Sequence, residues 1–144
     1  MPLHPIEAPV ASGTRTVRLV AIPVSAGFPS PAADDLEDDV DPIAWVVRHP
    51  NSTFWWRVEG DCLLDVGILD GDMIAVDRAG VGRNGRAVLA VVDGAVTAKL
   101  LRKEKGRVWL VPANRLEDYP AIPFTEDVEI WGVIAGVVRR YDLG

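Results

Sequence analysis

The sequence predicts a mostly β fold, a folded sheet or partial barrel of short strands with one short helix. From Thr53 onward, short runs of β-branched and aromatic residues alternate with turn residues such as Asp-Gly and Lys-Gly. Hydrophobic residues make up 49 % of the 144 residues, enough to build the core of one domain without disulfides. Only the stretch that begins at Asp41-Pro42 carries the signals of a helix start, which fits a fold with one short helix.

A change of composition divides the chain near residue 40. Residues 1–39 hold several prolines, one short strand pattern at 16–22 and a run of small residues at 25–27. Six of the eight residues from Asp34 to Asp41 are acidic, and such a block repels itself and is solvated. We therefore expect a flexible N-terminal arm over residues 1–39 and a globular body over residues 40–144.

The predicted helix has a clear beginning. Asp41 can serve as the N-cap, and Pro42 fits the first helical position. The helix should end at His49, because the following Pro50 restricts the residue before it. In that position His49 is most simply a C-terminal cap. The residues expected to face inward are Ile43, Val46 and Val47.

The strongest strand signal in the chain is a hairpin at Asp93-Gly94. Apolar runs at 86–92 and 95–101 flank these two residues, which suit a two-residue type I′ turn. Counting outward from such a turn pairs Val92 with Ala95 and Val88 with Lys99. The hairpin therefore places one lysine in the middle of an apolar strand.

Lys99 is the first candidate for chemistry. Its neighbours Ala98 and Leu100 are apolar, and Thr97 and Leu101 share its face of the strand. If that face is buried, removal from water favours the neutral amine, which can act as a general base. The alternative is that Lys99 lies on the solvated face of an edge strand, as most strand lysines do.

Cys62, the one cysteine in the chain, is the second candidate. It follows Gly60-Asp61 directly after a strand-like run, where a side chain can project and its own N–H can face an oxyanion. The alternative is a small buried hydrophobic residue. A Cys62–His49 pair is a weaker possibility, and Asp70 and Asp72 are better explained as turn residues. No His/Cys cluster has metal-ligand spacing, and we expect neither a metal nor a cofactor.

The charge balance favours a protein partner. The chain carries 21 acidic and 15 basic residues, for a net charge of −6, which argues against direct DNA binding. One cysteine cannot form an internal disulfide, and no apolar run approaches the length that spans a bilayer. From these features we expect a cytoplasmic protein that does not bind membranes.

Several ordered motifs resemble the LexA/UmuD family of self-cleaving serine peptidases of the SOS response. They are Ala26-Gly27, then Gly60-Asp61-Cys62-Leu63, then Thr97-Ala98-Lys99, with further likeness at Leu69-Asp70-Gly71-Asp72, Val111-Pro112-Ala113-Asn114 and the final strand. Only 26 residues precede Gly27, too few for the helix-turn-helix domain of the repressors. This N-terminal region, with Phe28-Pro29-Ser30-Pro31, resembles the UmuD branch.

The resemblance implies a LexA/UmuD-like C-terminal fold with a catalytic dyad of Cys62 and Lys99 and a cleavage site at Ala26-Gly27. It also implies a homodimer whose self-cleavage is promoted by the RecA–single-stranded-DNA filament. The shortened product would be the accessory subunit of an error-prone translesion DNA polymerase, with a UmuC-like catalytic subunit as its partner.

The sequence departs from the family at the nucleophile. Cys62 stands where the family has serine, Leu63 replaces the following methionine, and the segment after Asn114 is about two residues longer. A Cys62–Lys99 dyad could cleave, or the larger sulfur could block cleavage by altering the attack geometry. Two rival interpretations are a non-catalytic module that regulates a polymerase by binding alone, and a signal-peptidase-like enzyme.

Overall fold

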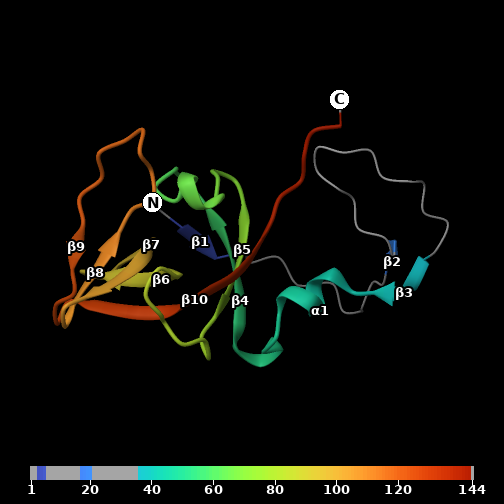
Figure 1. Cartoon of the computed structure of the whole chain (residues 1–144), viewed down its shortest axis with the longest axis horizontal. Helices are drawn as coiled ribbons and strands as arrows, with labels where there is room; N and C mark the ends of the chain where they lie inside the picture. The colour runs from blue at the N-terminus through green and yellow to red at the C-terminus, as the bar shows by residue number, and fades with distance from the viewer. Residues whose placement is uncertain (1–2, 6–16, 21–35, 144) are drawn as a thin grey trace.

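An open antiparallel sheet forms the body of the protein in the computed structural model, which describes residues 3–5, 17–20 and 36–143. Its eight strands lie in the order β1-β4-β5-β10-β6-β7-β8-β9 (Figure 1). Along the chain they span β1 Leu3–Pro5, β4 Thr53–Val58, β5 Met73–Asp77, β6 Ala87–Val92, β7 Ala95–Glu104, β8 Arg107–Val111, β9 Ile122–Pro123 and β10 Val128–Val138. The mostly β fold predicted from the sequence is confirmed.

The long strand β10, red in Figure 1, folds the sheet into its partial-barrel shape. Its first half pairs with β6 and its second half with β5, so that it joins two groups of strands. The register shifts once between Ile130 and Gly132 and again between Ile134 and Gly136, and such bulges bend a strand and increase its twist.

The bend gives the body two hydrophobic clusters. The first contains Cys62 itself and lies between the β4–β5 region and β6–β7; its buried members are Val58, Cys62, Leu63, Ile68, Ile74, Val76, Leu89 and Ala98. The second lies between β6, β7, β8 and β10; its buried members are Val88, Ala90, Leu101, Leu110 and Val128. Strand β7 contributes to both clusters, with Ala98 in the first and Leu101 in the second.

The predicted hairpin is confirmed residue by residue. Val92 pairs with Ala95 and Val88 pairs with Lys99. Asp93 and Gly94 have φ values of 50° and 81°, the positive pair that a type I′ turn requires. This turn therefore fixes the register of the hairpin, and with it the position of Lys99 opposite Val88.

The helix α1 (Pro42–Val46) begins as expected but ends early. The Asp41 carboxylate accepts hydrogen bonds from the N–H groups of Ile43 and Ala44. The expected extension to His49 was wrong, since Val47 is already extended. The expected inward face is confirmed only in part: Ile43 is 47 % exposed, whereas Val46 and Val47 are half-buried and Val46 lies against Gly136 of β10. His49 instead precedes a 3₁₀ turn, η1 (Pro50–Ser52).

The N-terminal region contributes three described strands. β2 (Val17–Val20), which falls within the predicted strand at 16–22, pairs with β3 (Leu36–Val40) in a separate two-stranded sheet on the opposite side of the molecule from β8 and β9 (Figure 1). β1 pairs antiparallel with β4, with His4 opposite Arg57, and also approaches β7. The start of the chain therefore adds a strand to the β4 edge of the main sheet.

Candidate active site

Cys62 lies on the tight turn that follows β4. Gly60 has a φ of 96°, a conformation that glycine adopts without strain, and its N–H donates to the Asp70 carboxylate at 2.7 Å. After this turn the chain enters a short 3₁₀ turn, η2 (Leu64–Val66). The turn brings Cys62 back into the first hydrophobic cluster, where its side chain is only 1 % exposed.

The structure brings Lys99 to this cysteine. The Lys99 Nζ lies 3.4 Å from the Cys62 Sγ and 2.9 Å from the Thr97 Oγ1. Lys99 is only 5 % exposed, so the interpretation of a solvated edge lysine was wrong. A buried lysine with so little contact with water is rare, and in its neutral form it can accept a proton from a neighbouring acid.

The thiol has a second partner on the same strand. The Cys62 Sγ lies 3.1 Å from the Ala98 carbonyl oxygen, to which the S–H can donate. Within residues 36–143, the Cys62 N–H donates no hydrogen bond. A sulfur beside an amine, with an unused backbone N–H on the same residue, is an arrangement that can attack a carbonyl and stabilise the oxyanion that forms.

The segment after β8 holds the cysteine turn in place. The N–H of Ala113 donates to the Cys62 carbonyl oxygen at 2.7 Å, and the Asp65 N–H donates to the Ala113 carbonyl oxygen at 2.7 Å. The side chain of Asn114, only 7 % exposed, donates to the Asp61 carbonyl oxygen at 2.7 Å. These bonds attach both ends of the turn to one rigid segment and so limit the freedom of Cys62.

Tyr119 reaches the same turn from farther along this loop. Its hydroxyl donates to the Asp61 carboxylate, with an oxygen–oxygen distance of 2.5 Å. This hydrogen bond, together with partial burial, raises the pKa of Tyr119 to about 12. Tyr119 therefore keeps its proton at neutral pH and remains a donor to the carboxylate beside Cys62.

A buried ion pair between Asp72 and Arg139 lies behind the turns that carry the site. Asp72 is 1 % exposed, and both of its oxygens lie 2.6 Å from Arg139 nitrogens, while Arg139 also donates to the Gly67 carbonyl oxygen. Burial alone would raise the pKa of Asp72, but the hydrogen bonds from Arg139 and from the Leu69 N–H hold it below its ordinary value. Asp72 is thus more than the turn residue that the sequence indicated.

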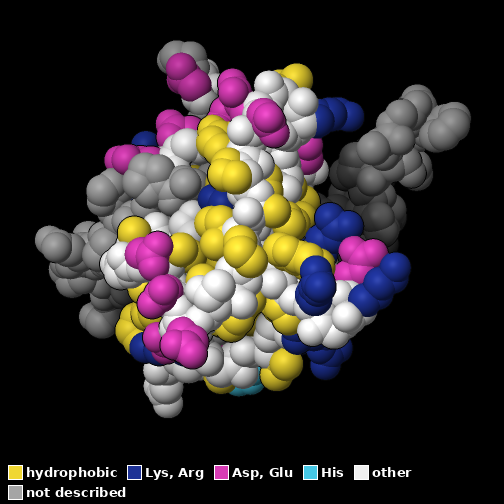
Figure 2. Space-filling view, turned by 90° about the vertical axis from the view of Figure 1, so that its left-hand side faces the viewer, with side chains coloured by type: hydrophobic (Ala, Val, Ile, Leu, Met, Phe, Trp, Pro, Cys, Tyr) yellow, Lys and Arg dark blue, Asp and Glu magenta, His cyan; other side chains and the backbone are white. Residues whose placement is uncertain are grey.

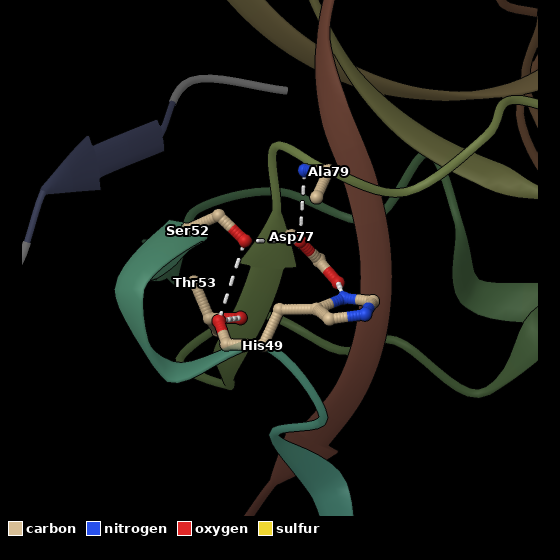
Figure 3. A network of polar contacts seen from close by, with 5 residues as sticks. All are labelled: His49, Ser52, Thr53, Asp77 and Ala79. Carbon is tan, nitrogen blue, oxygen red and sulfur yellow. Dashed lines mark hydrogen bonds and ion pairs between the residues drawn. The ribbon is translucent and has the colours of Figure 1, made fainter.

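His49 takes part in a different network, which Figure 3 shows. Its Nδ1 lies 2.5 Å from the Asp77 carboxylate, which also accepts from the Ser52 hydroxyl and the Ala79 N–H. Burial would raise the pKa of Asp77, but these three donors hold it below its ordinary value. The carboxylate lies between the serine and the histidine, so the three residues do not form a catalytic triad, in which histidine contacts serine. His49 precedes η1 instead of capping the C-terminus of α1, and its ring contacts Asp77 instead of Cys62.

A groove on the surface is lined by other residues than Cys62 and Lys99. It has a volume of about 430 Å³, and in it the Arg78 guanidinium stacks over the Trp131 ring at 4.5 Å. Other lining residues are Leu101, Lys103, Val108, Phe124 and Ile130. Figure 2, which views the side of the molecule that carries β8 and β9, shows a band of hydrophobic side chains with charged groups at its margins.

Some of the site could not be found in the sequence. The pairing of Cys62 with Lys99 follows from motif and hairpin, but nothing in the spacing indicated that Tyr119 would contact Asp61 or that Arg139 would contact Asp72. The expected cleavage site, Ala26-Gly27, lies outside the described residues. Within those residues, no helix is long and apolar enough to cross a bilayer, and no cluster of three or more His, Cys, Asp or Glu residues is suited to a metal.

Comparison with known proteins gives a consistent result. Residues 19–135 match the Peptidase S24-like family. The chain is 37 % identical to protein SamA of Salmonella typhimurium over 94 % of this chain and 92 % of that protein. It is 36 % identical to protein MucA of Escherichia coli over 89 % and 88 % of the two chains. It is also 37 % identical to the LexA repressor of Actinobacillus pleuropneumoniae, over 81 % of this chain but only 56 % of that longer protein.

Proposed function

The chain belongs to the Peptidase S24-like family, and we propose that it is a UmuD-like protein that cleaves itself between Ala26 and Gly27. The observation that carries this proposal is the 3.4 Å contact between the Lys99 Nζ and the Cys62 Sγ, in a pocket where both side chains are buried. A buried amine beside a nucleophile can act as a general base that removes the nucleophile's proton.

The proposed reaction begins with neutral Lys99, which takes the proton from Cys62. The sulfur attacks the carbonyl carbon of Ala26, and the Cys62 N–H stabilises the oxyanion. The C–N bond to Gly27 then breaks, and Lys99 returns its proton to the departing amine. Water hydrolyses the resulting thioester, which frees the Ala26 carboxylate and restores the thiol.

The biological role is proposed from the relatives. The likeness to SamA and MucA covers nearly the whole of each protein, whereas the repressor match leaves out almost half of its relative. This supports a role in SOS mutagenesis, in which residues 1–39 form an N-terminal arm that loses residues 1–26 on cleavage, and residues 40–144 form the body. In this role the chain acts as a homodimer, is cleaved when the RecA–single-stranded-DNA filament binds, and then serves a translesion polymerase.

The first experiment compares the natural chain with its Cys62→Ser and Cys62→Ser/Lys99→Ala variants by intact mass after incubation at mildly alkaline pH. We expect the Cys62→Ser chain to lose residues 1–26, because serine is the family's nucleophile, and we expect no product from Cys62→Ser/Lys99→Ala. Cleavage of the natural chain as well would make Cys62 a working nucleophile. If neither form is cut when RecA filament is added, the peptidase function is wrong and the non-catalytic interaction module replaces it.

A further inference from the structure

The loop after β8 places the side chain of Tyr119 at the cysteine turn. Neither the family match nor the dyad assigns this side chain a role. Tyr119 lies five residues beyond Asn114, in the part of the loop that is longer than the family pattern suggests. Its hydroxyl nevertheless reaches Asp61, the residue directly before Cys62, at 2.5 Å. The loop is held close to this turn by the Asn114 and Ala113 hydrogen bonds described above.

Asp61 is the carboxylate nearest in sequence to the nucleophile. A negative charge that turns toward the pair would stabilise the Lys99 ammonium ion and oppose formation of a thiolate at Cys62. Either effect would weaken the dyad, because the reaction needs a neutral amine and an ionised sulfur. The position of the Asp61 side chain therefore affects the chemistry even though it does not itself react.

We propose that Tyr119 is a positioning residue that holds the Asp61 carboxylate in place and keeps its negative charge from turning toward Cys62 and Lys99. The role as part of a cleaving site rests on the proposed function. The electrostatic effect on the thiol does not, and it can be measured without any cleavage.

The charges around Cys62 are few enough for this effect to be separated. Asp65 is already engaged by the Arg115 N–H at 2.8 Å and by its guanidinium at 3.7 Å. Lys99 faces the sulfur from β7, and Glu117 belongs to the same loop as Tyr119. Within the described residues, the charged and titratable groups linked to this turn by sequence or by contact are thus Asp61, Asp65, Asp70, Lys99, Arg115, Glu117 and Tyr119.

The test is the rate at which iodoacetamide alkylates Cys62, followed by intact mass as a function of pH. The chains compared are the natural protein, Tyr119→Phe, Asp61→Asn and the double variant. Transient opening of the buried site multiplies the alkylation rate by a similar factor at every pH. The position of the rate profile along the pH axis therefore reports the ionisation of Cys62. Tyr141→Phe, which changes the chain's other tyrosine, 75 % exposed and in contact with Arg139 instead of the cysteine turn, is the comparison variant.

We expect Tyr119→Phe to move the profile to higher pH and to slow alkylation near neutral pH by about tenfold, as a nearby unit charge would. In the Asp61→Asn background the same tyrosine change should have almost no effect. Coincident profiles for the natural chain and Tyr119→Phe would overturn the proposal. An equal slowing with and without the Asp61 carboxylate would also overturn it, because that result would show a packing effect.

The outcome is separable from that of the proposed function. If Cys62→Ser fails to cleave while the alkylation profile still moves, the peptidase assignment is wrong and the electrostatic role of Tyr119 stands. If Cys62→Ser cleaves but the profiles coincide, the reverse holds. Should Tyr119→Phe unfold the protein, Asp61→Asn alone decides the matter, since removal of the charge should leave the rate at neutral pH equal to or faster than that of the natural chain.

Discussion

Among single residues, the Asp72–Arg139 pair offers the clearest test of what holds the site together. We expect Arg139→Met to lower the melting temperature at neutral pH by on the order of 5 °C. The change removes the guanidinium from a carboxylate that is 1 % exposed and leaves that charge buried without its partner. Thermal unfolding followed by circular dichroism measures the difference, and Arg140→Met, a change at the exposed neighbouring arginine, is the matched control.

The pH dependence of this effect has a definite sign. The pKa of Asp72 is lower in the folded chain than its ordinary value, so the pair stabilises the protein above the ordinary Asp range and loses this contribution as the pH falls. The gap in melting temperature between the natural chain and Arg139→Met should therefore be full at neutral pH and shrink below about pH 4. A gap that stays constant down to about pH 2 would mean that the ion pair is not its source.

Residues differ in how far their roles could be predicted from the sequence. Cys62 and Lys99 could be identified because a motif and a two-residue turn place them within short stretches of chain. Asn114, Tyr119 and Arg139 could not, because each acts on a residue more than fifty positions away. Only the folded sheet sets such distances, and the pattern of a single sequence carries no information about them.

The strand β10 can be tested at two of its glycines. A Cβ at Gly132 would lie 2.7 Å from the Val76 Cγ1 and 3.0 Å from the Asp77 carbonyl oxygen. Val76 is fully buried and the carbonyl is fixed in β5, so neither can move aside cheaply. We expect Gly132→Ala to reduce the free energy of unfolding by about 1–3 kcal/mol, measured by urea denaturation.

Gly136→Ala is the comparison for this strand. Its Cβ would lie even closer to a neighbour, 2.5 Å from the Val46 Cγ1. Val46 belongs to α1, however, which has no buried residue and can shift by a few tenths of an ångström. The cost should be below about 1 kcal/mol. A larger loss at Gly136 than at Gly132 would show that α1 is held more firmly than its exposure indicates.

The same contrast explains which elements the sequence could predict. The Asp93-Gly94 hairpin depends on local turn chemistry, and its register was predicted correctly. The length of α1 depends on tertiary packing, because a helix this short has little stability of its own. Its predicted inward face was wrong at Ile43, because the sheet approaches α1 at Val46, which lies beside Gly136 of β10, and no sequence pattern reports that.

For the whole molecule, the position of β1 makes a prediction about the cleaved form. β1 belongs to the segment that cleavage at Ala26-Gly27 would remove, and it covers the outer edge of β4. A chain that begins at Gly27 should show faster hydrogen exchange at those amides of residues 56–58 that face β1 in the full chain. Hydrogen exchange followed by NMR measures this at single residues.

The central hairpin supplies the reference for that measurement. Amides of β6 that pair with β7 lie far from the N-terminus in the strand order and should keep their protection in both forms. Unchanged exchange at residues 56–58 in the shortened chain would mean that β1 contributes nothing to the protection of β4. Faster exchange throughout the body would instead indicate a global loss of stability.

The covalent link between β1 and the body explains why hydrogen exchange at β4 should become faster after cleavage. While the chain is intact, the tether keeps β1 at a high effective concentration beside β4, so that even a weak three-residue pairing persists. After the proposed cleavage, the released peptide would be present only at its bulk concentration, and the same pairing would become a bimolecular equilibrium that favours dissociation. Breaking one covalent bond would thus expose backbone donors and acceptors of β4, ready for the strand of another protein.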